Sequence, residues 1–250
     1  MKKVFIVEAL GSGHGSVARM FVSHNWAVTH ELEDADLVQF CGGSDINPSL
    51  YNQNVHKTTD YDQNRDNKEQ KIFTQAQELG IPCAGICRGG QFLHVMNEGE
   101  LWQDVNNHMG RHDVTMYGKL LPIEVSSDHH QMMALNTNTR SRAFILMFVE
   151  ELATYKTKMS ENMGSGAVYP ISRNVNSSNR DEDIEALWYP DTNCLCFQPH
   201  PEYAGYKDCE DAYFHFLNNY TFADDDTPFS TTTTKEICPD CKKQSDFCDC

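Results

Sequence analysis

A cysteine flanked by glycines is the residue of this chain best suited to do chemistry. Cys87 lies between Gly85 and Gly89, after the apolar segment 81–84 and before the helix-like segment 91–96. A side chain projected from a sharp strand-to-helix turn needs small neighbours, because bulk on either side collides with the adjoining backbone. The N–H groups and positive dipole end of the following helix favour the thiolate over the thiol. The pattern predicts that Cys87 is a nucleophile.

A base and a carboxylate follow much later in the chain. His200 and Glu202 flank a proline, and this i, i+2 spacing places both side chains on one side of an extended segment. A cysteine nucleophile needs a nearby base, and that base needs a group to orient it. We therefore predict a Cys87, His200 and Glu202 triad.

The elements that must position this triad alternate between strand and helix in the first half of the chain. Apolar runs predict strands at 2–7, 26–28, 36–41 and 81–84, and helical spacing predicts helices at 17–22, 68–79 and 91–96. Such alternation is typical of an α/β fold, with a mostly parallel sheet and helices on both faces.

The second half of the chain has a less regular order. Apolar runs predict strands at 120–125, 143–149, 184–188 and 194–198, and a closing helix at 210–220. The run 184–188 is expected to pair with 194–198 across a polar turn, in an antiparallel part of the sheet. The main domain is predicted to cover residues 1–222, followed by a linker at 223–235 and a cysteine-rich tail at 236–250.

Composition excludes several classes of function. The chain has 250 residues, with 36 acidic against 20 basic ones and a formal charge of −16, which would repel nucleic acid and anionic membranes. No apolar stretch is long enough to span a membrane, and Met1–Glu8 reaches a charge too early for a signal sequence. We expect a soluble, cytoplasmic protein whose ten cysteines are mostly reduced, with neither nucleic acid nor membrane as a partner.

Five ordered stretches resemble the class I glutamine amidotransferase superfamily, and in particular its gamma-glutamyl-gamma-aminobutyrate hydrolase-like branch, peptidase family C26. The stretches are Gly42 to Tyr51, Arg65-Asp66, Gly85 to Gly89, Ser127 to Gln131, and Ile184 to Ala186 followed by His200 to Glu202. The resemblance covers residues 2–222 and implies a three-layer, flavodoxin-like α/β/α fold. One departure is Pro199, where the family commonly has tryptophan, and the segment 150–183 and the tail have no clear counterpart.

The resemblance also implies roles for individual residues. Cys87 would attack the carbonyl of a glutamine or gamma-glutamyl amide, with proton transfer by His200 and orientation by Glu202. The backbone N–H groups of Gly43 and Arg88 would form the oxyanion hole, where each donor stabilises the transition state by about 2.7 to 4 kcal/mol. Three further residues are expected to contact substrate, namely His130, Gln131 and Gln91.

Several polar residues have a structural explanation that competes with the functional one. Asp45 and Arg65-Asp66 suit the capping and bracing of loops. Of the adjacent His129 and His130, at most one can face the site, and His130 is our choice. The glycine-rich segment 11–15 is interpreted as a strand-to-helix turn. Three other histidines are interpreted as hydrogen-bonded or solvated residues without a metal: His94, His108 and His112.

Four cysteines close the chain. Cys238, Cys241, Cys248 and Cys250 offer four thiolates, a set that suits tetrahedral zinc. The C-x2-C half is a good zinc knuckle, whereas the six-residue spacer and the C-x-C half are tighter than usual. A structural zinc site and a disordered, redox-labile tail both remain open interpretations.

The leading functional hypothesis is a cysteine-dependent hydrolase of gamma-glutamyl amides, acting on a gamma-glutamyl amine or glutamine through a thioester on Cys87. Its substrate is a small molecule and its catalysis needs no cofactor. A glutaminase subunit that delivers ammonia to a separate synthetase is the alternative with the same chemistry. A non-enzymatic binding or regulatory protein on the same fold is the alternative of another class.

Overall fold

The computed structural model describes residues 1–7, 13–117, 119, 121–149, 152–153, 155–159, 167–170 and 183–223. The predicted zinc tail and all but the first residue of the predicted linker lie outside these ranges, as do residues 11 and 12 and most of the segment 150–183. None of the helices in the described ranges combines the length and apolar character needed to cross a membrane.

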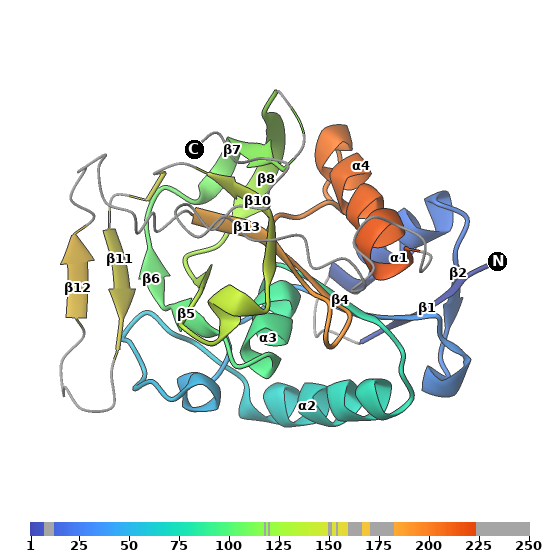
Figure 1. Ribbon diagram of the computed structural model, residues 1–250, viewed down its shortest axis with the longest axis horizontal. Coiled ribbons are helices and arrows are strands. Elements are labelled where there is room, and N and C mark those ends of the chain that lie inside the picture. Colours follow the sequence, from blue (N-terminus) through green and yellow to red (C-terminus); the bar gives the residue numbers. More distant parts are fainter. Residues whose placement is uncertain are drawn as a thin grey trace.

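A nine-stranded sheet forms the centre of the protein (Figure 1). Its order is β2-β1-β3-β4-β14-β13-β10-β7-β8, parallel from β2 to β14 and antiparallel from β14 to β8. The strands are β1 (Lys3–Ile6), β2 (Ala27–Thr29), β3 (Leu37–Phe40), β4 (Cys83–Ile86), β7 (Met109–Met116), β8 (Ile123–Asp128), β10 (Phe144–Val149), β13 (Asp183–Tyr189) and β14 (Cys194–Phe197). The predicted α/β fold with a mixed sheet and the predicted pairing of segments 184–188 and 194–198 are confirmed.

Two small sheets lie beside the large one. One has the order β12-β11-β6 and the other pairs β5 with β9. Their strands are β5 (Glu100–Trp102), β6 (Asp104–Val105), β9 (Met132–Ala134), β11 (Tyr155–Lys158) and β12 (Ala167–Pro170). In Figure 1, β11 and β12 lie at the far side of the molecule from β1 and β2.

Helices cover both faces of the large sheet (Figure 1). They are α1 (Gly13–Ser23), α2 (Gln63–Glu78), α3 (Arg88–Met96) and α4 (Lys207–Phe216), the last continuing as a π-helical turn at Leu217–Thr221. Short 3-10 turns occur at Leu32–Asp34, Pro48–Tyr51 and Thr139–Ser141.

The core is divided by the sheet because alternate side chains of each strand face opposite ways. In β14, Leu195 and Phe197 pack in a cluster with residues of α1 and α4, including Phe21 and Tyr213. The neighbouring Cys194 and Cys196 pack in a second cluster with residues of α2 and α3. The result is three layers, helix, sheet and helix.

Helix α2 begins five residues earlier than predicted. The prediction placed its start at Lys68, because the segment before it is entirely polar and lacks an apolar stripe. In the structure Asp62 caps the helix, and its Oδ1 accepts hydrogen bonds from the N–H groups of Asn64 (2.9 Å) and Arg65 (3.3 Å). Arg65 and Asp66 therefore lie on the helix rather than before it.

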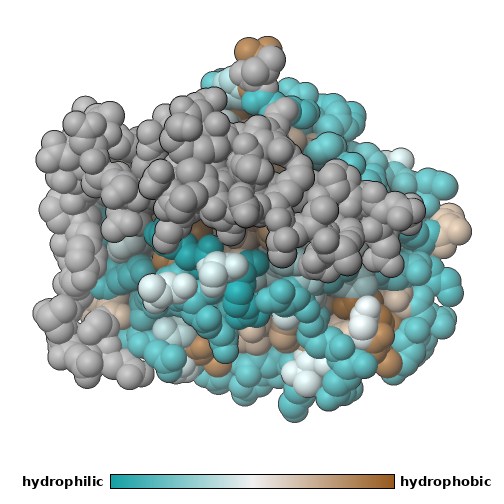
Figure 2. All heavy atoms as spheres, in the orientation of Figure 1, coloured by the Kyte–Doolittle hydropathy of each residue, from teal (hydrophilic) through white to brown (hydrophobic). Residues whose placement is uncertain are grey.

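The surface agrees with the strongly acidic composition. In the view of Figure 2, the described residues are mostly hydrophilic, and hydrophobic side chains are scattered singly or in small groups. Scattered apolar side chains of this kind are normal for a protein surface.

Candidate active site

Cys87 lies at the strained turn between β4 and α3. Its backbone has φ 52° and ψ −116°, a left-handed conformation that costs a non-glycine residue about 1–3 kcal/mol. The Cys87 N–H donates to the Phe197 carbonyl at 2.8 Å, which anchors the turn to β14. A Cβ on Gly85 would overlap the carbonyl of Gly89, so the close approach of strand and helix requires glycine there. The turn presents a buried thiol at the N-terminus of α3.

His200 and Glu202 meet as the sequence predicts. The Nδ1 atom of His200 lies 2.8 Å from Glu202 Oε1, and both side chains are buried. The Ser126 hydroxyl fixes the histidine backbone, because it accepts from the His200 N–H (3.0 Å) and donates to the His200 carbonyl (2.8 Å). The ring of Tyr203 stacks on the imidazole at 4.4 Å between centroids. Glu202 and Tyr203 therefore hold the imidazole, and Ser126 holds the backbone that carries it.

The same imidazole reaches Cys87. A Cβ placed on Gly42 would lie 3.1 Å from His200 Cε1 and 3.6 Å from Cys87 Cβ, so these two residues face each other across Gly42. Burial alone would lower the pKa of His200, but the charge and hydrogen bond of Cys87, together with Glu202, outweigh it and raise the pKa to about 10. Residues 113 positions apart in the chain thus form one cluster, and a histidine with this pKa stays protonated at neutral pH.

Gly43 and Arg88 carry the backbone N–H groups assigned to the oxyanion hole. Gly43 follows strand β3 with φ 147°, a conformation that side chains rarely allow. A Cβ there would overlap Arg65 Nη1, and Arg65 Nη2 donates to the carbonyls of Cys41 (2.9 Å) and Gly42 (3.1 Å). The Arg65 guanidinium therefore holds the glycine loop in place.

A buried ion-pair network joins that loop to the nucleophile turn. The Arg88 guanidinium pairs with both Asp66 and Glu69 of α2, and Glu69 also accepts from Arg65 Nε at 2.8 Å. Asp66 in turn accepts a hydrogen bond from the Asn47 N–H at 3.0 Å. Arg65 and Asp66 thus brace loops, as the structural interpretation of the sequence predicted.

The expected substrate residues lie in different environments. His130 is 39% exposed, and its Nε2 lies 3.2 Å from Asp45 Oδ1, a contact that raises its pKa. Gln131 is buried and donates from Nε2 to Thr59 Oγ1 at 3.2 Å. Gln91 is buried, and its Nε2 donates to the Gln131 carbonyl (2.8 Å) and to Gln198 Oε1 (3.0 Å). Substrate contact by these residues stays a prediction.

His94 and His129 are core residues. His94 contacts the Tyr189 hydroxyl (2.7 Å) and the Ala134 carbonyl (3.1 Å), so its interpretation as a hydrogen-bonded histidine is confirmed. His129 points to the opposite side from the exposed His130, and burial lowers its pKa to about 4. Only His130 of the adjacent pair faces outward.

A second cluster of ionisable side chains was not found from the sequence. His108, His112 and His129 surround the carboxylate of Glu185, which is fully buried in β13. Burial would raise the pKa of Glu185, but its interactions with the neighbouring imidazoles outweigh it and lower the pKa to about 2. The available signal was a glutamate inside the apolar run 184–189, where a charge needs partners.

Two solved structures from Thermotoga maritima have a similar fold. A structure titled as a glutamine amidotransferase from Thermotoga maritima matches with TM-score 0.50 and 14% identity, over 87% of this chain and 82% of that one. A structure of PurLQS from Thermotoga maritima matches with TM-score 0.50 and 15% identity, over 87% and 98% of the two chains. The two matches show that this chain shares its fold with these proteins.

The family follows from the sequence match. The family model described as Peptidase C26 matches residues 6–202, most of the chain, and the protein belongs to that family. A Mycobacterium tuberculosis protein named "Putative glutamine amidotransferase Rv2859c" is 29% identical over 176 residues, 68% of this chain. The match spans about half of that relative, 52% of its length.

Proposed function

We propose that this protein hydrolyses gamma-glutamyl amide bonds through a thioester on Cys87. The observation that carries the proposal is the meeting of a strained cysteine turn with the hydrogen-bonded His200 and Glu202 pair. A nucleophile, a base and a group that orients the base, each held by buried contacts, are the parts that acyl transfer requires.

The chemistry follows from the charges at the site. The Cys87 thiolate, paired with protonated His200, attacks the amide carbonyl, and the N–H groups of Gly43 and Arg88 stabilise the oxyanion. His200 gives its proton to the leaving amine or ammonia and then takes one from water, which cleaves the thioester. Glu202 keeps the imidazole oriented in both steps, because it accepts from Nδ1 at 2.8 Å.

Turnover and adduct formation on named substrates test the proposal. Purified protein is supplied with gamma-glutamyl-aminobutyrate or glutamine, the released amine or ammonia is measured, and the intact mass is followed for an adduct on Cys87. Wild type is expected to turn over at least one substrate. Cys87→Ala is expected to lose both signals, whereas Cys83→Ala, which removes a buried thiol at the start of β4, keeps them.

A second function shares this chemistry. A glutaminase subunit that passes ammonia to a separate synthetase would use the same nucleophile, base and oxyanion donors. Preference for glutamine over gamma-glutamyl-aminobutyrate would support that alternative. No turnover of either substrate, together with no labelling of Cys87 by a glutamine-mimicking alkylator, would instead indicate a non-enzymatic protein on this fold.

A further inference from the structure

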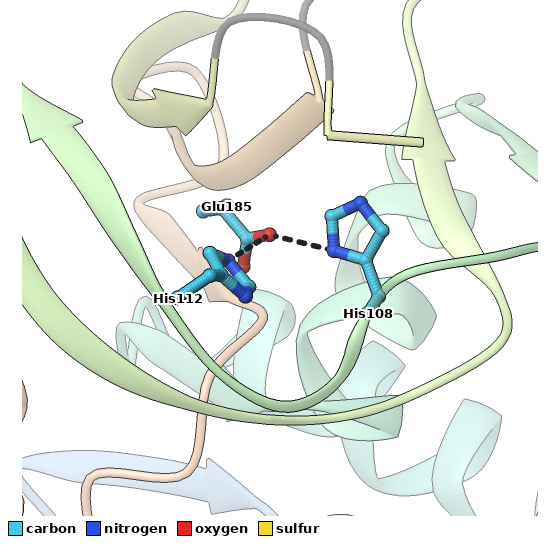
Figure 3. Close-up of side chains that lie close together, drawn as sticks. All are labelled: His108, His112 and Glu185. Carbon is cyan, nitrogen blue, oxygen red and sulfur yellow. Dashed lines mark hydrogen bonds and ion pairs between the residues drawn. The ribbon is translucent and has the colours of Figure 1, made fainter. Parts of the chain in front are cut away.

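The buried cluster around Glu185 brings metal-ligand side chains together from separate elements. His108 immediately precedes β7, His112 lies within β7, and Glu185 lies on β13. One ligand atom from each lies within 4.8 Å of the others, and all three side chains are at least nine-tenths buried. Figure 3 shows both imidazoles directed toward the one carboxylate.

The spacing of the ligand atoms matches a metal site. His112 Nε2 lies 3.1 Å and His108 Nδ1 lies 3.3 Å from Glu185 Oε1. Zinc bonds of about 2.0–2.1 Å to nitrogen and oxygen place tetrahedral ligand atoms about 3.3 Å apart. An ion could therefore enter between these atoms with little movement of the side chains.

Unpartnered atoms in the cluster point to a missing ligand. Among the described residues, four of its buried polar atoms have no hydrogen-bond partner, namely His108 Nδ1, His112 Nδ1, His129 Nε2 and Glu185 Oε2. His129 lies at 2% exposure with Nδ1 2.8 Å from the Gln131 carbonyl, so Nδ1 carries the proton in the neutral ring. Its Nε2 then carries no proton to donate to Glu185 Oε1, 3.9 Å away, and is available to bind a cation.

The proposed ligand His108 is oriented by a carboxylate on its other ring nitrogen, as metal-binding histidines commonly are. His108 Nε2 lies 2.9 Å from Asp183 Oδ2, the carboxylate-to-histidine contact that orients a metal-binding imidazole. Asp183 is fixed by Lys156 Nζ at 2.6 Å and by the Ala153 N–H at 2.7 Å. This support keeps His108 Nδ1 directed at Glu185 Oε1, where an ion between the two atoms could bind both.

We propose that His108, His112 and Glu185 bind a divalent transition-metal ion of the zinc type, with His129 Nε2 as a fourth ligand. Two imidazoles and one carboxylate suit zinc better than calcium or magnesium, which prefer oxygen ligands. The ion would join the start of β7 to β13, two strands that β10 separates in the sheet. This proposal revises the interpretation of His108 and His112 as residues without a metal, and it is independent of the proposed reaction.

Metal content of the full-length chain tests the site. All four tail cysteines are changed to serine in the background protein (Cys238→Ser, Cys241→Ser, Cys248→Ser, Cys250→Ser), so that they cannot bind the probe. After incubation with Zn²⁺ and desalting, the background protein is expected to hold one equivalent by mass spectrometry. His112→Ala is expected to reduce the content at least tenfold, whereas His30→Ala, an exposed histidine, leaves it unchanged.

A second variant and a second measurement distinguish loss of the metal site from loss of folding. His112→Gln keeps a polar side chain, and circular dichroism identifies the variants that fold. Zn²⁺ is expected to raise the Tm of the background protein by several degrees and that of folded His112 variants by less than one degree. The proposal is overturned if the background protein retains no zinc, or if folded His112 variants retain as much; the cluster is then an ion-pair network balanced by protons.

Discussion

Gly43→Ala offers the sharpest test of the oxyanion hole. The residue has φ 147°, and a new Cβ would overlap the Arg65 guanidinium that holds the loop. A left-handed conformation costs a non-glycine residue about 1–3 kcal/mol, and the disturbed charged hydrogen bonds add about 1–3 kcal/mol. The loop would shift, and its N–H would no longer point at the developing oxyanion.

The expected fall in activity of Gly43→Ala is set by the loss of one oxyanion donor. Removing an oxyanion donor costs about 2.7–4 kcal/mol, so kcat should fall about 10²–10³-fold. The hole binds the transition state more strongly than the substrate, and kcat and kcat/KM should therefore fall together. Amine release with the best substrate of the wild type measures both.

Gly80→Ala is the matched control for backbone strain. Gly80 follows α2 with φ 68°, and a Cβ there meets nothing within 4 Å in the described structure. This variant should lose about 1–3 kcal/mol of stability and keep kcat. The reasoning is refuted if folded Gly43→Ala keeps kcat within tenfold of wild type, or if Gly80→Ala loses as much activity.

Three further predictions concern stability. Arg88→Met should lower the free energy of unfolding in urea by about 3–5 kcal/mol, because it leaves the buried Asp66 without an ion-pair partner and Glu69 with Arg65 alone. The exposed Lys71→Met should change it by less than about 0.5 kcal/mol, and equal effects would contradict the role of the network. The folded-state pKa of His200 is raised from 6.5 to about 10, so the stabilising contribution of its protonated ring is complete below pH 6.5 and lost as pH rises through 10. The Tm of the wild type should therefore exceed that of His200→Gln by less as pH approaches 10, and a difference that grows toward pH 10 would argue against this. Gly85→Ala should not yield folded protein at 37 °C, because its Cβ would overlap backbone atoms; a Tm near that of wild type would refute the packing argument.

Local patterns predicted much of the fold and the central residues of the site. The turn at Cys87 and the pair of His200 and Glu202 depend on neighbouring residues, and the parallel strands carry strong apolar runs. Strand β7 was missed because Met109–Met116 is mostly exposed and mixes glycine with charged residues, so neither helical nor strand alternation stands out. Its place is set by pairing with β8, which sequence patterns do not show.

The other features that the sequence did not predict depend on signals that are weak locally or on contacts between distant segments. The start of α2 lies in polar sequence, where a single capping aspartate was the only local signal. The cluster at Glu185 assembles from residues 108 to 185, and its members separately have the ordinary explanations of buried or solvated histidines. Only their proximity in the folded protein distinguishes these histidines from ordinary buried or solvated ones.

Helix α2 couples the positions of the two residues proposed as oxyanion donors, Gly43 and Arg88. One helical turn carries the residues that contact both the glycine loop and the guanidinium of the residue after the nucleophile. A tilt of that helix would change both donor positions in concert, so substitutions some twenty residues ahead of the thiol could tune the reaction rate without touching any bound molecule.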